Sequence, residues 1–192
     1  MRILRVFLAL GFLLVPFATP SWSVFEISEC GTEIPENETG YLIADLDCSD
    51  SEGAGVVLGN GARLVLGGFR IEADPTLGEK RQGVRCRTSS VCRVIGPGEI
   101  IGFSASGIAG TRVHARDVLL TGNAIAGVVA YENIRLHNVV IEGNGLLGVH
   151  AGGKVVGRGN DVGEHALADV LQSHAPRFRP ARGSCSHDGE QG

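Results

Sequence analysis

The sequence between Gly107 and Val170 repeats at a spacing of 21 residues, and this repeat limits the possible folds more than any other feature. Four apolar positions return one period later and then, less regularly, a second time: Val113, Ala115, Val118 and Leu120, then Ile134, Leu136, Val139 and Ile141, then Val155, Gly157, Asn160 and Val162. The pair Gly127-Val128 returns as Gly148-Val149 and more loosely as Asp169-Val170. Two short alternating runs, a polar bend and a glycine turn in each period predict a stacking solenoid.

The same kind of alternation begins upstream, at Gly55, where short apolar runs are separated by glycine turns. The chain has 29 glycines and only 5% aromatic residues, which fits many short strands rather than a helical bundle. We therefore predict an all-β solenoid of about five coils over residues 55–171. Residues 74–82 form a polar excursion that lengthens one coil. At the end, Val170-Leu171 adds a strand or 166–171 forms a short capping helix, and the register favours the strand.

Two asparagines occupy equivalent places in the repeat. Asn123 stands four residues before Gly127 and Asn144 four before Gly148, so a stacked column of Phe103, Asn123, Asn144 and His165 is expected. Coils about 4.8 Å apart would bring the two amides together. They could then bond to each other and to backbone groups at a buried bend. We predict a structural role for both.

The N-terminal residues 1–23 have the features of a signal peptide. Arg2 and Arg5 precede an apolar run from Val6 to Phe17 that is too short to span a bilayer, and small residues follow. We expect an exported product, periplasmic or extracellular, without a membrane span in the mature chain; an uncleaved anchor is the alternative. Residues 24–54 lack the repeat and are expected to cap the solenoid, and residues 172–192 form a flexible tail.

Cysteine usage fits export, because thiols oxidise outside the cytoplasm. Cys86 and Cys92 flank a short polar turn and are candidates for a local bridge. Cys30 and Cys48 would then close the N-terminal segment, although spacing alone does not fix the connectivity. Cys185 is left over. No spacing resembles a zinc site, so no metal is expected.

These stretches resemble the right-handed parallel β-helix proteins of the pectate-lyase-like superfamily, in particular exported bacterial members without an assigned activity. The resemblance rests on 118–128 (VLLTGNAIAGV) and 139–149 (VVIEGNGLLGV), with support from 64–71 (LVLGGFRI) and 94–103 (VIGPGEIIGF). It implies a right-handed parallel β-helix. In such proteins a further cysteine usually follows a tail like 176–185, so the resemblance adds a truncated member as one alternative interpretation of this chain. The fold carries lyases, hydrolases, epimerases, adhesins and inert scaffolds, so it implies no single activity.

Acidic side chains show no catalytic pair in the register of the repeat. Asp117 is followed by Asn138 and Gly159, and Glu142 lies between Thr121 and Gly163, so we expect no column with two acids. Glycoside hydrolysis needs two facing carboxyl groups, and a calcium site needs several converging oxygens. We assign no catalytic residue, metal or cofactor. A polysaccharide lyase or hydrolase that uses Asp117 and Glu142 stays an alternative.

Basic side chains do form columns at the polar bend. Arg116, His137 and Arg158 share one column, and His114 and Arg135 share the column two residues earlier. Arginine holds carboxylates through two hydrogen bonds, so this stripe could bind an acidic polysaccharide. A solvated face that resists lateral association is the alternative.

The net charge argues against nucleic acid as the partner. It is −4 for the full chain and −6 without residues 1–23, which hold two arginines and no acid. The sequence thus predicts an exported, non-catalytic carbohydrate-binding scaffold, with an enzyme or a truncated structural member without activity as alternatives.

Overall fold

The computed structural model describes residues 24–76, 81–87, 91–163 and 168–172. The predicted signal peptide, His165, Cys185 and the tail after residue 172 lie outside these ranges. Within them the chain forms twenty short strands and no helix. This part of the chain therefore holds no apolar helix of membrane-spanning length.

The strands form three parallel sheets, named here A, B and C. Sheet A contains β1 (Phe25–Ile27), β3 (Thr39–Leu42), β6 (Arg63–Val65), β9 (Val91–Ile95), β12 (Arg112–Arg116), β15 (Ile134–His137) and β18 (Val155–Arg158). Sheet C contains β4 (Leu46–Asp47), β7 (Arg70–Glu72), β10 (Glu99–Ile101), β13 (Leu119–Thr121), β16 (Val140–Glu142) and β19 (Asp161–Gly163). Sheet B contains β2 (Thr32–Ile34), β5 (Val56–Leu58), β8 (Val84–Cys86), β11 (Ser106–Gly110), β14 (Ala126–Ala130), β17 (Leu147–Ala151) and β20 (Ala168–Gln172).

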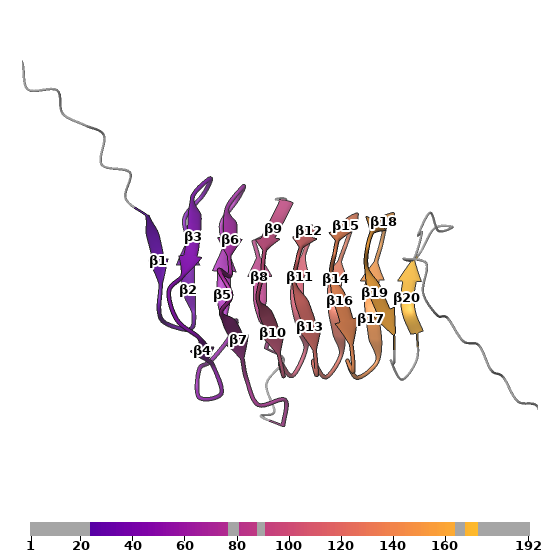
Figure 1. Cartoon of the computed structure of the whole chain (residues 1–192), viewed down its shortest axis with the longest axis horizontal. Helices are drawn as coiled ribbons and strands as arrows, with labels where there is room; N and C mark the ends of the chain where they lie inside the picture. Colours follow the sequence, from indigo (N-terminus) through magenta and orange to yellow (C-terminus); the bar gives the residue numbers. More distant parts are fainter. Residues whose placement is uncertain (1–23, 77–80, 88–90, 164–167, 173–192) are drawn as a thin grey trace, which may run out of the picture.

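From β3 onward the strands follow one another in the order A, C, B, so each coil adds one strand to each sheet. The coils lie side by side along the long axis, with β1 at one end and β20 at the other (Figure 1). The protein is a parallel β-helix of about six coils, as sheet C, with six described strands, indicates. We expect the coil to be right-handed, as nearly all parallel crossover connections are.

The register between coils is the one that the repeat predicts. Val113 lies beside Ile134, which lies beside Val155. Ile141 lies between Leu120 and Val162 in the same way. Strand β20 follows the same register. Its Val170 lies beside Val149 of β17, so Val170-Leu171 belongs to a strand and not to a helix.

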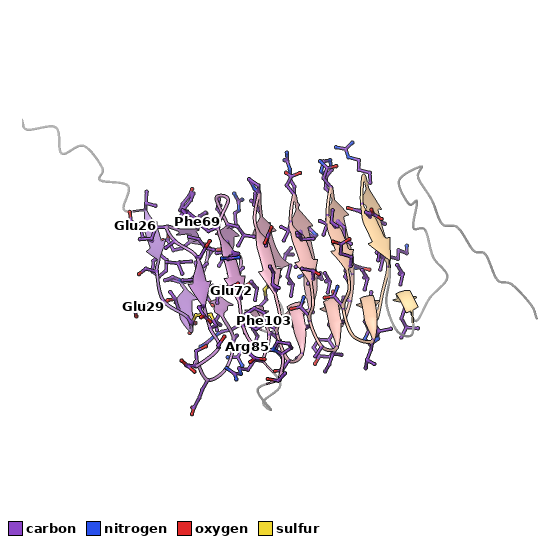
Figure 2. The ribbon with its side chains drawn as sticks, turned by 60° about the horizontal axis from the view of Figure 1, so that its bottom comes forward. Glu26, Glu29, Phe69, Glu72, Arg85 and Phe103 are labelled. Atoms are coloured by element: carbon purple, nitrogen blue, oxygen red, sulfur yellow. A yellow bond between two sulfur atoms is a disulfide. The ribbon has the colours of Figure 1, made fainter. Side chains whose placement is uncertain are left out.

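Alternation along each strand places apolar side chains inside the coil. In sheet C the middle residues Ile71, Ile100, Leu120 and Ile141 form a fully buried ladder, while their strand neighbours face outward. Phe103, labelled in Figure 2, is also fully buried. Each such side chain contributes about 1.5–3 kcal/mol by leaving water, so the stacked ladders hold the coil together.

Asn123 and Asn144 form a hydrogen-bonded ladder at the corner between sheets C and B. Both are buried, at 0% and 2% exposure. The Asn123 Nδ2 donates to Asn144 Oδ1 at 2.8 Å and to the Ile100 carbonyl at 3.4 Å. Asn123 Oδ1 accepts from the Phe103 amide, and Asn144 Oδ1 accepts from the Asn123 amide. The amides thus satisfy backbone groups that have no water to bond to.

The N-terminal segment, 24–54, belongs to the stack. Its strands β1 to β4 pair with the three sheets, which adds to the expected number of coils. Disulfides join Cys30 to Cys48 in this segment and Cys86 to Cys92 further along. The buried Arg81 fixes the loop after Cys48 by donating to the carbonyls of Cys48, Ser49 and Ser51.

Candidate anion-binding face

The outer face of sheet A carries the basic residues. In β12 the buried Val113 and Ala115 alternate with His114 and Arg116, whose side chains are partly or fully exposed. The same alternation in β15 turns Arg135 and His137 outward. A strand that is buried on one side only leaves its other side free to carry charge.

These residues form two columns across neighbouring coils. The arginine column, as named here, consists of Arg63, Arg93, His114 and Arg135 on β6, β9, β12 and β15. The corner column consists of Arg116, His137 and Arg158 on β12, β15 and β18, next to the corner between sheets A and C. Together they make up the basic face.

A depression lies between the two columns. It is lined by Arg93, Ile95, His114, Arg116, Arg135 and His137 and floored by the strands that carry them. Five of these six side chains are basic, and Ile95 adds an apolar contact. The depression can therefore hold an anionic group while the face on either side continues along the coil axis.

His114 sits between two arginines of its column. Its burial lowers the pKa of the imidazole, and the nearby charges of Arg135, Arg93 and Arg112 lower it further. His114 is therefore held neutral at a pH where an ordinary histidine begins to protonate.

The corner column differs from the arginine column because one of its members, Arg116, forms an ion pair with a carboxylate. The Arg116 Nε donates to Asp117 Oδ2 at 2.9 Å, and Asn138 Nδ2 donates to Asp117 Oδ1 at 3.0 Å. The Asn138 bond first, and Arg116 second, lower the pKa of the Asp117 carboxyl. Among the described residues no ion pair or hydrogen bond involves the guanidinium groups of Arg135 and Arg158.

The backbone conformation explains why an aspartate, an asparagine and a glycine directly follow the three residues of the corner column. Asp117, Asn138 and Gly159 stack at the turn out of sheet A, and all three have positive φ, at 55°, 51° and 63°. Aspartate, asparagine and glycine tolerate this conformation better than other residues. The turn therefore provides an aspartate beside Arg116 and an uncharged residue in the next two coils.

His137 is partly buried at the end of β15. Its Nδ1 is buried and has no hydrogen-bond partner within the described part of the chain.

Sheet C carries the acidic residues, and here one expectation was wrong. Asp47 and Glu72 are direct neighbours in one column, so a column with two acids does exist. Arg70 pairs with Glu72 and with a third acid, Asp45: its Nε lies 3.5 Å from Glu72 Oε2 and 3.4 Å from Asp45 Oδ2. The regular repeat does not reveal this pair, because the step from Asp47 to Glu72 is longer than one period. Among the described residues no group of three or more His, Cys, Asp or Glu side chains could hold a metal ion.

The two acids of the hydrolytic alternative come from different parts of the coil. Asp117 lies at the corner after β12, whereas Glu142 ends β16 of sheet C, beside Thr121. Asp117 is already held by Arg116 and Asn138. The arrangement gives no support to a facing pair of carboxyl groups.

Sequence reasoning named five basic residues and missed Arg63 and Arg93. Arg93 lies one regular period before His114, whereas the step from Arg63 to Arg93 is longer than one period. The signal that could have found Arg93 is the regular repeat itself, extended one coil upstream. Comparison of the chain with protein families, with curated proteins and with solved structures gives no match, so the parallel β-helix and its basic face rest on the geometry of the chain itself.

Proposed function

We propose that the basic face binds an acidic polysaccharide and that the protein is an exported, non-catalytic carbohydrate-binding scaffold. One observation carries the proposal, namely the column in which Arg63 lies beside Arg93, and Arg93 and Arg135 flank His114, with no ion pair to any of the three arginines among the described residues. Like charges on neighbouring strands repel one another and destabilise a sheet. A bound polyanion would remove this repulsion, and guanidinium groups hold carboxylates through paired hydrogen bonds.

The residues around the arginines favour a glycan over a nucleic acid. No Phe, Tyr or Trp occurs in β6, β9, β12, β15 or β18, so these strands offer no platform on which bases could stack. Ile95 instead gives a small apolar contact beside the charges, suited to the C–H groups of a sugar ring. The net charge of −4 also opposes general attraction to nucleic acid.

Export is part of the proposal for two reasons. The two disulfides fit an oxidising compartment. The N-terminal segment, 1–23, has the composition of a signal peptide. The resemblance of the repeat to the pectate-lyase-like superfamily is compatible with a polysaccharide partner.

The experiment is a pull-down of the oxidised protein with alginate, hyaluronate, dextran sulfate, neutral dextran and single-stranded DNA, over a range of salt concentrations. We expect binding to the acidic glycans only, weakened by salt, and its loss in the double variant Arg93→Ala/Arg135→Ala with the unfolding temperature unchanged. Equal binding by the double variant would refute the role of the face. Preference for DNA would replace the glycan with a nucleic acid.

Catalysis is monitored in the same samples through new reducing ends and unsaturated-sugar absorbance. Cleavage of any glycan would replace the scaffold proposal with the lyase or hydrolase alternative. Absence of binding and cleavage in the whole panel would leave the protein as a structural product without a glycan ligand.

A further inference from the structure

Acidic residues border the basic face at both edges of sheet A: Glu132 pairs with Arg112 at the corner between sheets B and A, and Asp117 pairs with Arg116 at the corner between sheets A and C. At the corner between sheets A and C a second depression is lined by Asp117, Glu99, Asn138 and neighbouring backbone. Asp117 lines this second depression and contacts Arg116, which lines the first. A polyanion on sheet A meets a fixed negative charge when it reaches this corner.

Asp117 also withdraws one arginine from the ligand. Its Oδ2 lies 2.9 Å from Arg116 Nε, and Asn138 holds its Oδ1, so the carboxylate is fixed rather than free to swing away. The Arg116 side chain is 65% exposed and would otherwise be open to a ligand. In the next two coils the equivalent positions are Asn138 and Gly159, so His137 and Arg158 have no such acid after them.

We propose that Asp117 determines the charge selectivity of the proposed polysaccharide site, by holding Arg116 and restricting an anionic chain to the arginine column. This inference rests on the proposed function. A glycan with one carboxylate per sugar needs only one column of arginines. A glycan with several sulfates per sugar would gain from both columns, and Asp117 reduces that gain by repulsion and by occupying Arg116. Asp117 is therefore a specificity residue that discriminates against the more densely charged polymer.

The test uses Asp117→Asn, which keeps the shape of the side chain and a residue type that tolerates positive φ. Glu142→Gln is the control, since it removes the same charge from an exposed position on sheet C. Affinities for alginate and for dextran sulfate are measured at fixed salt for both variants and the wild type. Exposed ion pairs have small energies, so we expect Asp117→Asn to tighten dextran sulfate binding by up to about five-fold. Alginate binding should change less, and Glu142→Gln should change neither.

A double-mutant cycle separates selectivity from a structural effect. Arg116→Ala should weaken dextran sulfate binding little in the wild type and clearly more in the Asp117→Asn background, because only there is Arg116 available. Equal gains for both glycans, or an equal effect of Arg116→Ala in both backgrounds, would overturn the inference while leaving the binding face in place. If neither the wild type nor Asp117→Asn binds either polymer, both the inference and the proposed function are wrong.

Discussion

Sheets A and C share the same coils and the same kind of buried ladder, yet their outer faces carry opposite charge. The strands of sheet A carry six arginines, two histidines and a single acid, Glu26 of the first coil (Figure 2). The strands of sheet C carry five acids and one arginine. The inward residues are fixed by packing, whereas the outward residues are not, so the charge of each face is independent of the fold.

The charged side chains are also arranged differently on the outer faces of the two sheets. Sheet C pairs its single arginine, Arg70, with Asp45 and Glu72, and places Ile101 and Thr121 between Glu72 and Glu142 in the column. Sheet A stacks Arg63 directly on Arg93 and leaves His114 as the only spacer before Arg135. The one pair of like charges stacked on sheet C, Asp47 beside Glu72, has Arg70 next to it, whereas the run on sheet A has no ion pair and the proposed anion would offset its repulsion.

The largest expected effect comes from a substitution in the buried apolar ladder, on which the outer faces of both sheets depend. Ile141 is fully buried in the ladder under sheet C, so Ile141→Asp places an unpaired charge among apolar side chains. We expect a loss of more than about 4 kcal/mol of stability, enough to unfold the chain and remove both faces. Circular dichroism and thermal unfolding check this, with the exposed neighbour change Glu142→Gln as control. A folded Ile141→Asp protein would mean that the ladder is not the core.

The second effect concerns the asparagine ladder at the corner between sheets C and B. Asn123→Ala leaves the Phe103 backbone N–H buried without its acceptor and removes one of the two donors to Asn144 Oδ1, for a loss of about 1–3 kcal/mol. Denaturant unfolding of both single variants and of Asn123→Ala/Asn144→Ala measures the coupling, expected at about 0.5–3 kcal/mol. Strictly additive effects would show that the two amides act separately.

The third prediction compares a charge reversal on the basic face with the same charge reversal on sheet B. Arg135→Glu reverses a charge in the arginine column and should weaken binding of an acidic glycan by about ten-fold or more, because charge-assisted hydrogen bonds are lost and repulsion is added. Arg85→Glu makes the same change on the exposed face of sheet B and should leave binding unchanged. Titration of the glycan at fixed salt gives both values. Equal losses in the two variants would mean that only net charge matters, not the basic face.

The sequence predicts most of the regular part of the molecule because each stacked coil needs apolar side chains at the same inward positions. Apolar positions one period apart give the register from β12 to β18, and the same step places Asn144 on Asn123 and His137 beside Arg116. The repeat does not predict a coil in 24–54, and it does not give the register of the coils upstream of β9. There the steps between sheet A strands, from Thr39 to Arg63 and from Arg63 to Arg93, are both longer than the regular period and differ from each other.

The physical reason is that a corner can lengthen without disturbing the strands on either side. Residues 73–83 lie between β7 and β8, so the period lengthens there while the ladders on either side continue. The pairing of Arg116 with Asp117 was equally hidden, because neighbours in sequence usually point to opposite faces of a strand. Only the positive φ of Asp117 at the end of β12 turns its carboxylate back toward Arg116.

The smallest expected effect is a pH dependence confined to the basic face, since no strand of sheet C contains histidine. His114 faces Arg93 and Arg135 across the coils and Arg112 and Arg116 along its own strand, and its pKa lies below the ordinary value of 6.5. In the free protein the unfolded chain therefore binds more protons, and stability falls as the pH drops below about 6.5. A bound polyanion opposes the arginine charges and favours protonated His114, so binding becomes tighter over the same range.

The stability of the free protein and its affinity for the polyanion should therefore change in opposite directions with pH, and both can be measured. Thermal unfolding from pH 8 to pH 5 should show destabilisation of the free protein on acidification, and titration with dextran sulfate should show tighter binding, by less than about ten-fold because that would require a full unit of pKa change. Dextran sulfate is used because its sulfates stay ionised at pH 5. His114→Gln should flatten both slopes, and His150→Gln on sheet B, away from the basic face, should leave the pH dependence of binding unchanged. Parallel slopes for stability and binding in the wild type would show that the ligand does not act on His114, and would place the anion on the corner column instead.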